Sequence, residues 1–155
     1  MNEPTDFLLP QTTHARVEAA SRKRVLQQMS ECLSEQHEEL DCRTVLDALL
    51  ARERLGSTGL GEGVAIPHCR VSCSQIYGAF YTLQEPVDFE APDDARVDLV
   101  FVLIVPEGEE QAHLAHLARL AAVFSQPDAQ ASFRASSNDS ELFSRITSFL
   151  QRDAA

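Results

Sequence analysis

The sequence predicts an α/β fold built around one central strand. The run Val97–Val105 is apolar except at Asp98 and rich in β-branched residues, which is typical of a strand buried on both faces of a sheet. Segments with apolar residues at helical spacing lie both before and after this run, as a sheet covered by helices requires. The chain has 155 residues, enough for one domain with a substantial core.

Two helices are predicted in the first third of the chain. Residues 1–13 carry two prolines and little periodicity, so we expect an extended lead-in there and a single domain over residues 14–151. A helix is predicted from Ser21, with an apolar face at a period of 3.6 formed by Val25, Leu26, Met29, Cys32 and Leu33. A second helix is predicted from the N-cap Asp41 to the stop signal Gly56, with an inward face of Val45, Leu46, Leu49 and Leu50.

A glycine-rich segment follows the second helix. Four of the six glycines of the chain fall within Gly56–Gly63, a density that disfavours a helix and lets backbone N–H groups approach a ligand. The segment lacks the Gly-Lys-Ser/Thr of a P-loop, and Val64 stands where a dinucleotide fingerprint needs its third glycine, so nucleotide binding is not predicted. Val64–Ile66 predicts a short buried strand, which Pro67 ends and which presents His68 at its edge.

The second half of the chain continues the alternation of strands and helices. A strand is predicted over Ile76–Leu83 and a Pro/Asp-rich connection over Gln84–Arg96, before the central strand. Pro106 and Gly108 end that strand. The next helix has an acidic start and an inward face of Leu114, Leu117, Leu120, Ala121 and Phe124. A short helix from Pro127 to Arg134 and a C-terminal helix capped by Asn138 and Glu141 complete the fold; the inward face of the last helix is Leu142, Phe143, Ile146, Phe149 and Leu150.

The charge of the chain excludes several classes of partner. Thirteen basic and 24 acidic residues give a net charge of −11, which repels nucleic acid and anionic lipid surfaces. The longest apolar run, Leu99–Val105, is far shorter than the roughly 18–20 residues of a spanning helix. We therefore expect neither nucleic-acid binding nor membrane insertion. The N-terminus is acidic and has no apolar signal region, so we expect a cytoplasmic location and reduced cysteines.

His68 is the strongest candidate for chemistry. It follows the glycine-rich segment and the helix end that carries Arg52, so a nucleophilic nitrogen, backbone donors and a cation would meet, as binding of a phosphoryl group requires. The alternative is an ordinary histidine beside a tight turn, with the arginine as a solvated helix-end charge. His113 and His116 share a helix face, but their spacing, and that of Cys69 and Cys73, matches no common zinc motif. No metal or other cofactor is predicted.

The segment Arg52–His68 contains the string Gly-Ser-Thr-Gly-x-Gly-x-Gly-x-Ala-Ile-Pro-His. It resembles the signature of the fructose/mannitol-type enzyme IIA (EIIA type-2) domain of the bacterial phosphotransferase system. Val97–Pro106 followed by His113 resembles the central strand and second histidine of that family, and the resemblance covers about residues 15–150. It implies a mixed, mostly parallel central sheet flanked by helices on both faces. The Gly56–Gly59 form and the Ser-Arg-Lys-Arg helix start at Ser21 resemble the nitrogen-regulatory branch most closely.

The resemblance also implies functional roles. His68 would be the phosphorylated histidine, His113 a second active-site histidine, and Arg52 the cation that contacts the phosphate. A loop around the phosphate would consist of Gly56, Ser57, Thr58, Gly59, Gly61 and Gly63. The phosphodonor would be an HPr-like phosphocarrier protein, and the output would be regulation of target proteins through the phosphorylation state.

Two other functions stay open at this point. The first is a sugar-specific enzyme IIA that passes the phosphoryl group to a separate enzyme IIB. The second is a non-catalytic module that binds an anion or a metal. If the site meets a phosphocarrier, as the resemblance implies, we expect acidic residues that flank the two histidines in the sequence to steer a basic carrier: Glu62, Glu107, Glu109 and Glu110.

Overall fold

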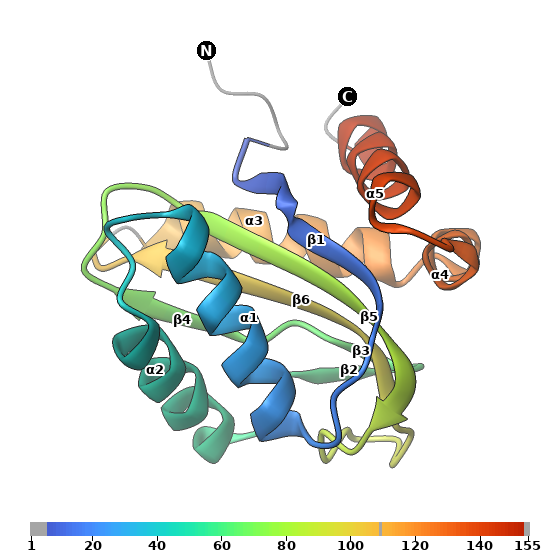
Figure 1. The fold of residues 1–155 in the computed structure, drawn as a ribbon, viewed down its shortest axis with the longest axis horizontal. Coiled ribbons are helices and arrows are strands. Elements are labelled where there is room, and N and C mark those ends of the chain that lie inside the picture. The colour runs from blue at the N-terminus through green and yellow to red at the C-terminus, as the bar shows by residue number, and fades with distance from the viewer. Residues whose placement is uncertain (1–5, 109, 154–155) are drawn as a thin grey trace.

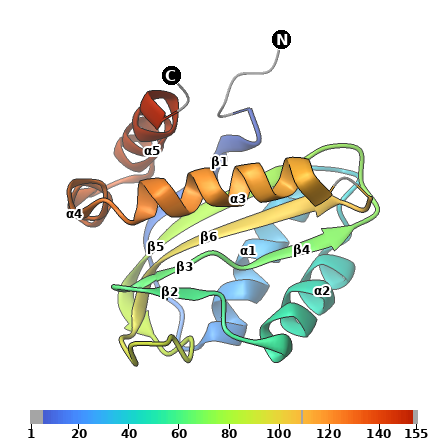
Figure 2. The same ribbon diagram turned by 180° about the vertical axis from the view of Figure 1, so that it is seen from behind.

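The computed structural model describes residues 6–108 and 110–153. A six-stranded sheet lies between two layers of helices (Figures 1 and 2). Its strands follow the order β1 (Leu8–Val17), β5 (Tyr77–Val87), β6 (Val97–Pro106), β3 (Val64–Ala65) and β2 (Gly59–Gly61), and β4 (His68–Val71) also pairs with β6. No helix in the described ranges combines the length and apolar character that a membrane crossing requires.

The sheet is mixed, as predicted, but parallel only in part. The pairs β1–β5, β3–β6 and β4–β6 are parallel, whereas β2–β3 and β5–β6 are antiparallel. The antiparallel β5–β6 pair is long and lies in the middle of the sheet. At one end of it Tyr77 pairs with Ile104, and at the other end Val87 pairs with Val97. Strands β3 and β4 occupy successive stretches of the same side of β6.

Strand β6 is buried on both faces, which confirms the prediction for Val97–Val105. On one face Val100, Val102 and Ile104 pack in a core with α1 (Arg22–Gln36) and α2 (Cys42–Leu55). On the other face Leu99, Phe101 and Leu103 pack in a second core with α3 (Glu110–Phe124), α4 (Pro127–Ala135) and α5 (Asp139–Asp153). The two helix layers therefore cover opposite faces of the sheet (Figures 1 and 2).

The helix ends agree with the capping signals in the sequence. Ser21 accepts a hydrogen bond from the Arg24 N–H at 3.1 Å, and Asp41 accepts one from the Thr44 N–H at 2.9 Å. Asn138 accepts one from the Glu141 N–H at 2.9 Å, beside the start of α5. Each bond satisfies a donor that the first turn of a helix leaves unpaired, which favours the start of the helix at that position.

Three predictions about elements were wrong. Leu8–Thr13 belongs to β1 and not to a lead-in before the domain. The buried Thr12 and Thr13 hydroxyls donate to the carbonyls of Gly78 and Leu9, so this strand shows little apolar alternation in the sequence. Strand β5 extends to Val87, into the predicted connection Gln84–Arg96. Leu114 is 63% exposed and does not belong to the inward face of α3.

Gly63 shows how tightly the turn between β2 and β3 is packed. Its φ of +82° is unfavourable for other residues, and a Cβ there would lie 2.5 Å from Arg134 Nη2 and 2.9 Å from Asp98 Oδ1. These two side chains form an ion pair, and Arg134 Nη2 also donates to the Glu62 carbonyl at 2.7 Å. Any side chain at position 63 must therefore displace the pair.

We expect Gly63→Ala to lower the free energy of unfolding by about 2–4 kcal/mol, from backbone strain together with the disturbed ion pair. Gly108→Ala is the matched control, because Gly108 has a φ of +95° but a Cβ there would meet no atom of the described chain within 4 Å. Its cost should be the backbone strain alone, about 1–2 kcal/mol. Urea denaturation of both variants measures the difference, and equal losses would show that the packing around Gly63 is unimportant.

Candidate active site

His68 lies where the edge of the sheet is interrupted. It was expected at the end of a strand, but it begins β4, where it pairs with Leu103 of β6. Pro67 has no N–H and separates β3 from β4, while its carbonyl accepts from the Leu103 N–H at 2.9 Å. The preceding carbonyl, that of Ile66, accepts a hydrogen bond from His68 Nδ1 at 2.8 Å. The imidazole is therefore attached to the backbone two residues before it.

This bond determines the tautomer of the His68 ring. A carbonyl oxygen can only accept, so Nδ1 carries the hydrogen and Nε2 of the neutral ring keeps its lone pair. Burial lowers the pKa of His68 below its usual 6.5, and the positive charges of Arg52 and Arg70 lower it further, against the opposite effect of the bond to Ile66. The ring is therefore neutral near pH 7, with a nucleophilic nitrogen at Nε2.

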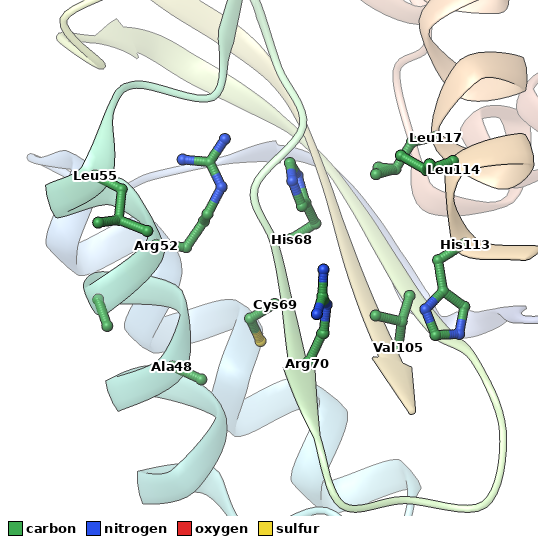
Figure 3. A pocket seen from close by; sticks show the side chains of 11 residues that line it. Ala48, Arg52, Leu55, His68, Cys69, Arg70, Val105, His113, Leu114 and Leu117 are labelled. Carbon is green, nitrogen blue, oxygen red and sulfur yellow. The ribbon is translucent and has the colours of Figure 1, made fainter. Parts of the chain in front are cut away.

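A cavity of about 670 Å³ opens beside His68 between α2, β4 and α3. Figure 3 shows His68 on β4 between α2, which carries Arg52, and α3, which carries His113 and Leu114. A second hollow of about 410 Å³ continues from it toward Ser57–Leu60. The two share four lining residues: Arg52, His68, Leu114 and Leu117. His68 thus lies at the junction of a continuous groove.

Two arginines line the cavity with His68. Arg52, which was predicted for the site, occupies the last turn of α2, where its Nη1 donates to the Gly56 carbonyl at 2.8 Å. A guanidinium has five N–H donors, so this bond leaves others for an anion. Arg70 was not predicted, although the alternation of a strand places residues 68 and 70 on the same face. Both arginines influence the titration of His68, so their charges act on the same small space.

The two histidines of α3 have different surroundings. His113, in the first turn of the helix, is buried and lines the cavity, and neither of its ring nitrogens has a hydrogen-bond partner within the described part of the chain. His116 instead packs edge-on against Phe7, with ring centroids 5.6 Å apart. The structure therefore brings His113, but not His116, to the wall of the cavity that contains His68. Within the described residues, no group of three His, Cys, Asp or Glu side chains is arranged to hold a metal ion.

The glycine-rich loop divides into two parts. Ser57, Thr58 and Gly59 line the groove, whereas Gly61, at the end of β2, and Gly63, in the β2–β3 turn, lie outside it. Several loop donors already have partners: the N–H groups of Gly56, Thr58 and Gly59 donate to the Glu53 carbonyl, the Glu53 carboxylate and Ser57 Oγ. These bonds stabilise the conformation of the loop. Contacts between the loop and a phosphate stay a prediction.

Glu53 is a residue of this region that sequence reasoning missed. It is buried, it accepts from the Thr58 hydroxyl at 2.5 Å, and Arg22 of α1 lies 3.3 Å from its carboxylate. These contacts tie the end of α2 to the loop and to α1, which fixes the position of the neighbouring Arg52. In the sequence, Glu53 is only a glutamate between two arginines with a threonine five residues later. This pattern is too common to predict a buried carboxylate that connects α2 to the loop and to α1.

Comparison with known proteins agrees with this geometry. Residues 6–149 match the family described as the phosphoenolpyruvate-dependent sugar phosphotransferase system, EIIA 2. The chain belongs to the EIIA type-2 family. It is 42% identical over 138 residues to a nitrogen regulatory protein of Pseudomonas aeruginosa, an alignment that covers 88% of this chain and 90% of that protein. The match starts at residue 6, which agrees with the place of β1 inside the domain.

Two solved structures show the same fold. The crystal structure of the nitrogen regulatory protein IIA-Ntr from Neisseria meningitidis superimposes with a TM-score of 0.83 at 37% identity, over 94% of this chain and 97% of the other. The Escherichia coli complex of enzyme IIA mannitol with phosphorylated enzyme IIB mannitol gives a TM-score of 0.69 at 19% identity, over 86% and 92% of the two chains. The second likeness concerns the fold alone.

The charged side chains that line the EIIA cavity are not the acidic residues expected to form a rim around it. Glu62 is turned to Gln130, 3.1 Å away, and lines neither hollow. Glu107 lines neither hollow, and Glu109 and the side chain of Glu110 lie outside the described residues. The charged side chains at the cavity are instead the cations Arg52 and Arg70. Glu62 and Glu107 therefore lie outside the walls of both hollows, and their steering of a basic carrier stays a prediction.

Exposed leucines surround the opening of the EIIA groove. Among the described residues the large hydrophobic side chains that are exposed are Leu55 at 85%, Leu60 at 50% and Leu114 at 63%. Each of them lines one of the two hollows beside His68. Exposed apolar side chains that cluster at one place are typical of a protein-interaction surface, whereas single exposed ones are common on any protein.

We expect His68 to titrate below pH 6.5, and we expect Arg52→Gln to raise its midpoint, because loss of a nearby cation makes the imidazolium less unfavourable. The Cε1–H chemical shift followed by NMR measures both values. Arg43→Gln, which removes an exposed charge of α2 outside the cavity, should leave the midpoint unchanged. A midpoint at or above 6.5 in the unmodified protein would show that the site does not keep this ring neutral.

Proposed function

We propose that this EIIA chain accepts a phosphoryl group on His68 Nε2 from an HPr-like phosphocarrier protein and acts as a regulatory protein through its phosphorylation state. The observation that supports this most directly is the bond from His68 Nδ1 to the Ile66 carbonyl, beside two arginines. It leaves Nε2 as the nucleophile, with cations close to where a phosphoryl group would arrive. The family and the regulatory names of its relatives agree with this function.

The transfer step follows from these contacts. The Nε2 lone pair attacks phosphorus in line with the bond to the donor group, and that bond breaks as the N–P bond forms. The ring gains positive charge, which the Ile66 carbonyl stabilises through the retained Nδ1–H. Arg52 and Arg70 neutralise charge on the phosphoryl oxygens. Positioning and electrostatic stabilisation therefore provide most of the catalysis.

His113 completes the proposed site. Its ring is buried at the cavity wall without a hydrogen-bond partner in the described part of the chain, and an unpartnered buried polar group is costly unless a ligand or a partner engages it. We assign it to contacts with the phosphoryl group during transfer, when the carrier covers the groove.

The exposed leucines give the carrier its docking surface. Leu55, Leu60 and Leu114 each line a hollow that His68 also lines. One partner face that covers all three leucines would therefore also cover the histidine. Burial of apolar side chains around a reactive centre excludes water and orients two proteins for in-line transfer.

A sugar-specific enzyme IIA that passes phosphate to a separate enzyme IIB is the second candidate. The fold neighbour from Escherichia coli was solved in such a complex, with phosphorylated enzyme IIB mannitol. Incubation of the phosphorylated protein with isolated enzyme IIB proteins separates the two functions. Rapid loss of the phosphoryl group to one of them would favour the sugar-specific role, and retention would favour regulation.

We expect His68→Ala to abolish phosphate acceptance and to leave the fold intact, because this partly exposed side chain contributes little to either core. Intact mass after incubation with phosphoenolpyruvate, enzyme I and the HPr-like carrier measures acceptance, and circular dichroism measures folding. In the unmodified protein the added group should be labile in acid and stable in base. Undiminished phosphorylation of a folded His68→Ala protein would refute the assignment and favour a module that only binds an anion.

His113→Ala should slow transfer by about 10²–10³, the usual effect of removing one preorganised stabilising group, with a smaller change in carrier binding. His116→Ala is the matched control, because His116 belongs to the same helix but packs against Phe7 outside the cavity. Rapid-quench kinetics gives the rate constants. An equal loss in both variants would point to a general effect of α3, and an unchanged rate in His113→Ala would refute the role of His113.

A further inference from the structure

A second cluster of reactive side chains lies at the opposite edge of the sheet from His68. It joins three elements: His14 from β1, Cys32 from α1 and Asp139 from α5. Among the described strands β1 pairs with β5 alone, so it forms the edge of the sheet far from β4 (Figure 1). The β1–β5 pairing is irregular on both sides of Thr13–His14. Such irregularities redirect a side chain, here toward α1 and α5.

The three side chains are arranged as thiol, imidazole and carboxylate. His14 Nδ1 lies 2.8 Å from Asp139 Oδ2, and the other carboxylate oxygen accepts from the Ala15 N–H, also at 2.8 Å. His14 Nε2 lies 2.9 Å from the Gln11 carbonyl and 3.7 Å from Cys32 Sγ. The Cys32 thiol also donates to the Gln11 carbonyl, at 3.3 Å. Asp139 is thus held by the backbone of β1 and in turn orients the ring, so Nε2 lies beside both the Gln11 carbonyl and the sulfur.

The charges around the ring favour its protonated form. Both ring nitrogens face acceptors, a carboxylate and a carbonyl, which only an imidazolium can satisfy together. The Cys32 side chain and, after it, Asp139 raise the pKa of His14 to about 9, despite partial burial. Glu35 of α1 and Tyr81 of β5 also face the cluster, and burial raises the pKa of Tyr81, so that phenol is neutral. The imidazolium is therefore the cation next to the sulfur.

We propose that Cys32, beside the oriented His14 ring, is a modification site for small uncharged electrophiles, hydroperoxides in particular. The thiolate attacks one peroxide oxygen, an S–O bond forms, and the O–O bond breaks. The leaving oxygen takes the proton of His14 Nε2, so that hydrogen peroxide gives water and a sulfenic acid, with a two-electron oxidation of sulfur. The net charge of −11 favours an uncharged reagent over an anionic one.

The other three cysteines have different surroundings. Cys69 is buried, and burial raises its pKa to about 12. Burial is also the largest cause that raises the pKa values of Cys42 and Cys73. Cys42 is partly exposed, as Cys32 is, and lies on a neighbouring helix, so it serves as an internal control in the same sample.

The test is alkylation of the folded protein with iodoacetamide, with each cysteine quantified by peptide mass spectrometry across a range of pH. Near neutral pH, Cys32 should react at least about tenfold faster than Cys42, because a histidine cation lies beside its sulfur. Both His14→Gln and Asp139→Asn should slow Cys32 to the rate of Cys42. Asparagine can still accept the hydrogen bond from the Ala15 N–H. The Asp139→Asn variant therefore removes the negative charge of residue 139 while it keeps this contact with the backbone of β1. After hydrogen peroxide treatment, dimedone should label Cys32 first.

Equal rates for Cys32 and Cys42, or a Cys32 rate that is unaffected in a folded Asp139→Asn protein, would overturn the proposal. Dimedone labelling of another cysteine before Cys32 would also contradict it. His68→Ala should leave the Cys32 rate unchanged, because the two sites lie at opposite edges of the sheet. The result is therefore independent of the phosphoryl transfer proposed above.

Discussion

The hydrogen bond from His68 Nδ1 to the Ile66 carbonyl decides which ring nitrogen is available for chemistry. It depends on Pro67, which lies between β3 and β4, the two short strands that pair with the same side of β6. At this interruption the Ile66 carbonyl bonds to the imidazole instead of to a strand. The Pro67 carbonyl pairs with Leu103 of β6. The backbone next to the histidine is therefore paired with a strand that is buried on both faces, while the ring itself lines the cavity.

The helices were predictable from the sequence because their signals are local. The cap residues Ser21, Asp41 and Asn138 each bond to an N–H three residues on, so a short window contains the whole interaction. Strand β1 was not predictable, because its buried threonines are satisfied by carbonyls that include one 66 residues away. Pro67 was interpreted as the end of a strand, and only the pairing with β6 shows that the strand continues as β4.

The candidate site was predictable where one segment carries it. Arg52 and His68 belong to a single motif, and the structure brings both to one cavity. Arg70 could have been found from strand alternation, had β4 been recognised. Glu53 was not predictable, because its importance comes from contacts with Arg22 and Thr58 that exist only in the folded chain. The same holds for the cluster at the far edge, whose three side chains come from β1, α1 and α5.

The most direct measurement is the imidazole ¹⁵N spectrum of the phosphorylated protein with labelled histidine. The account predicts that phosphorus is attached to Nε2 of His68 and that Nδ1 keeps its hydrogen, since the Ile66 carbonyl holds that nitrogen as a donor. Coupling between phosphorus and Nε2, with a protected Nδ1–H signal, would agree with this. Phosphorus on Nδ1, or on another histidine, would contradict it, because the bond that organises the site would then have to break before transfer.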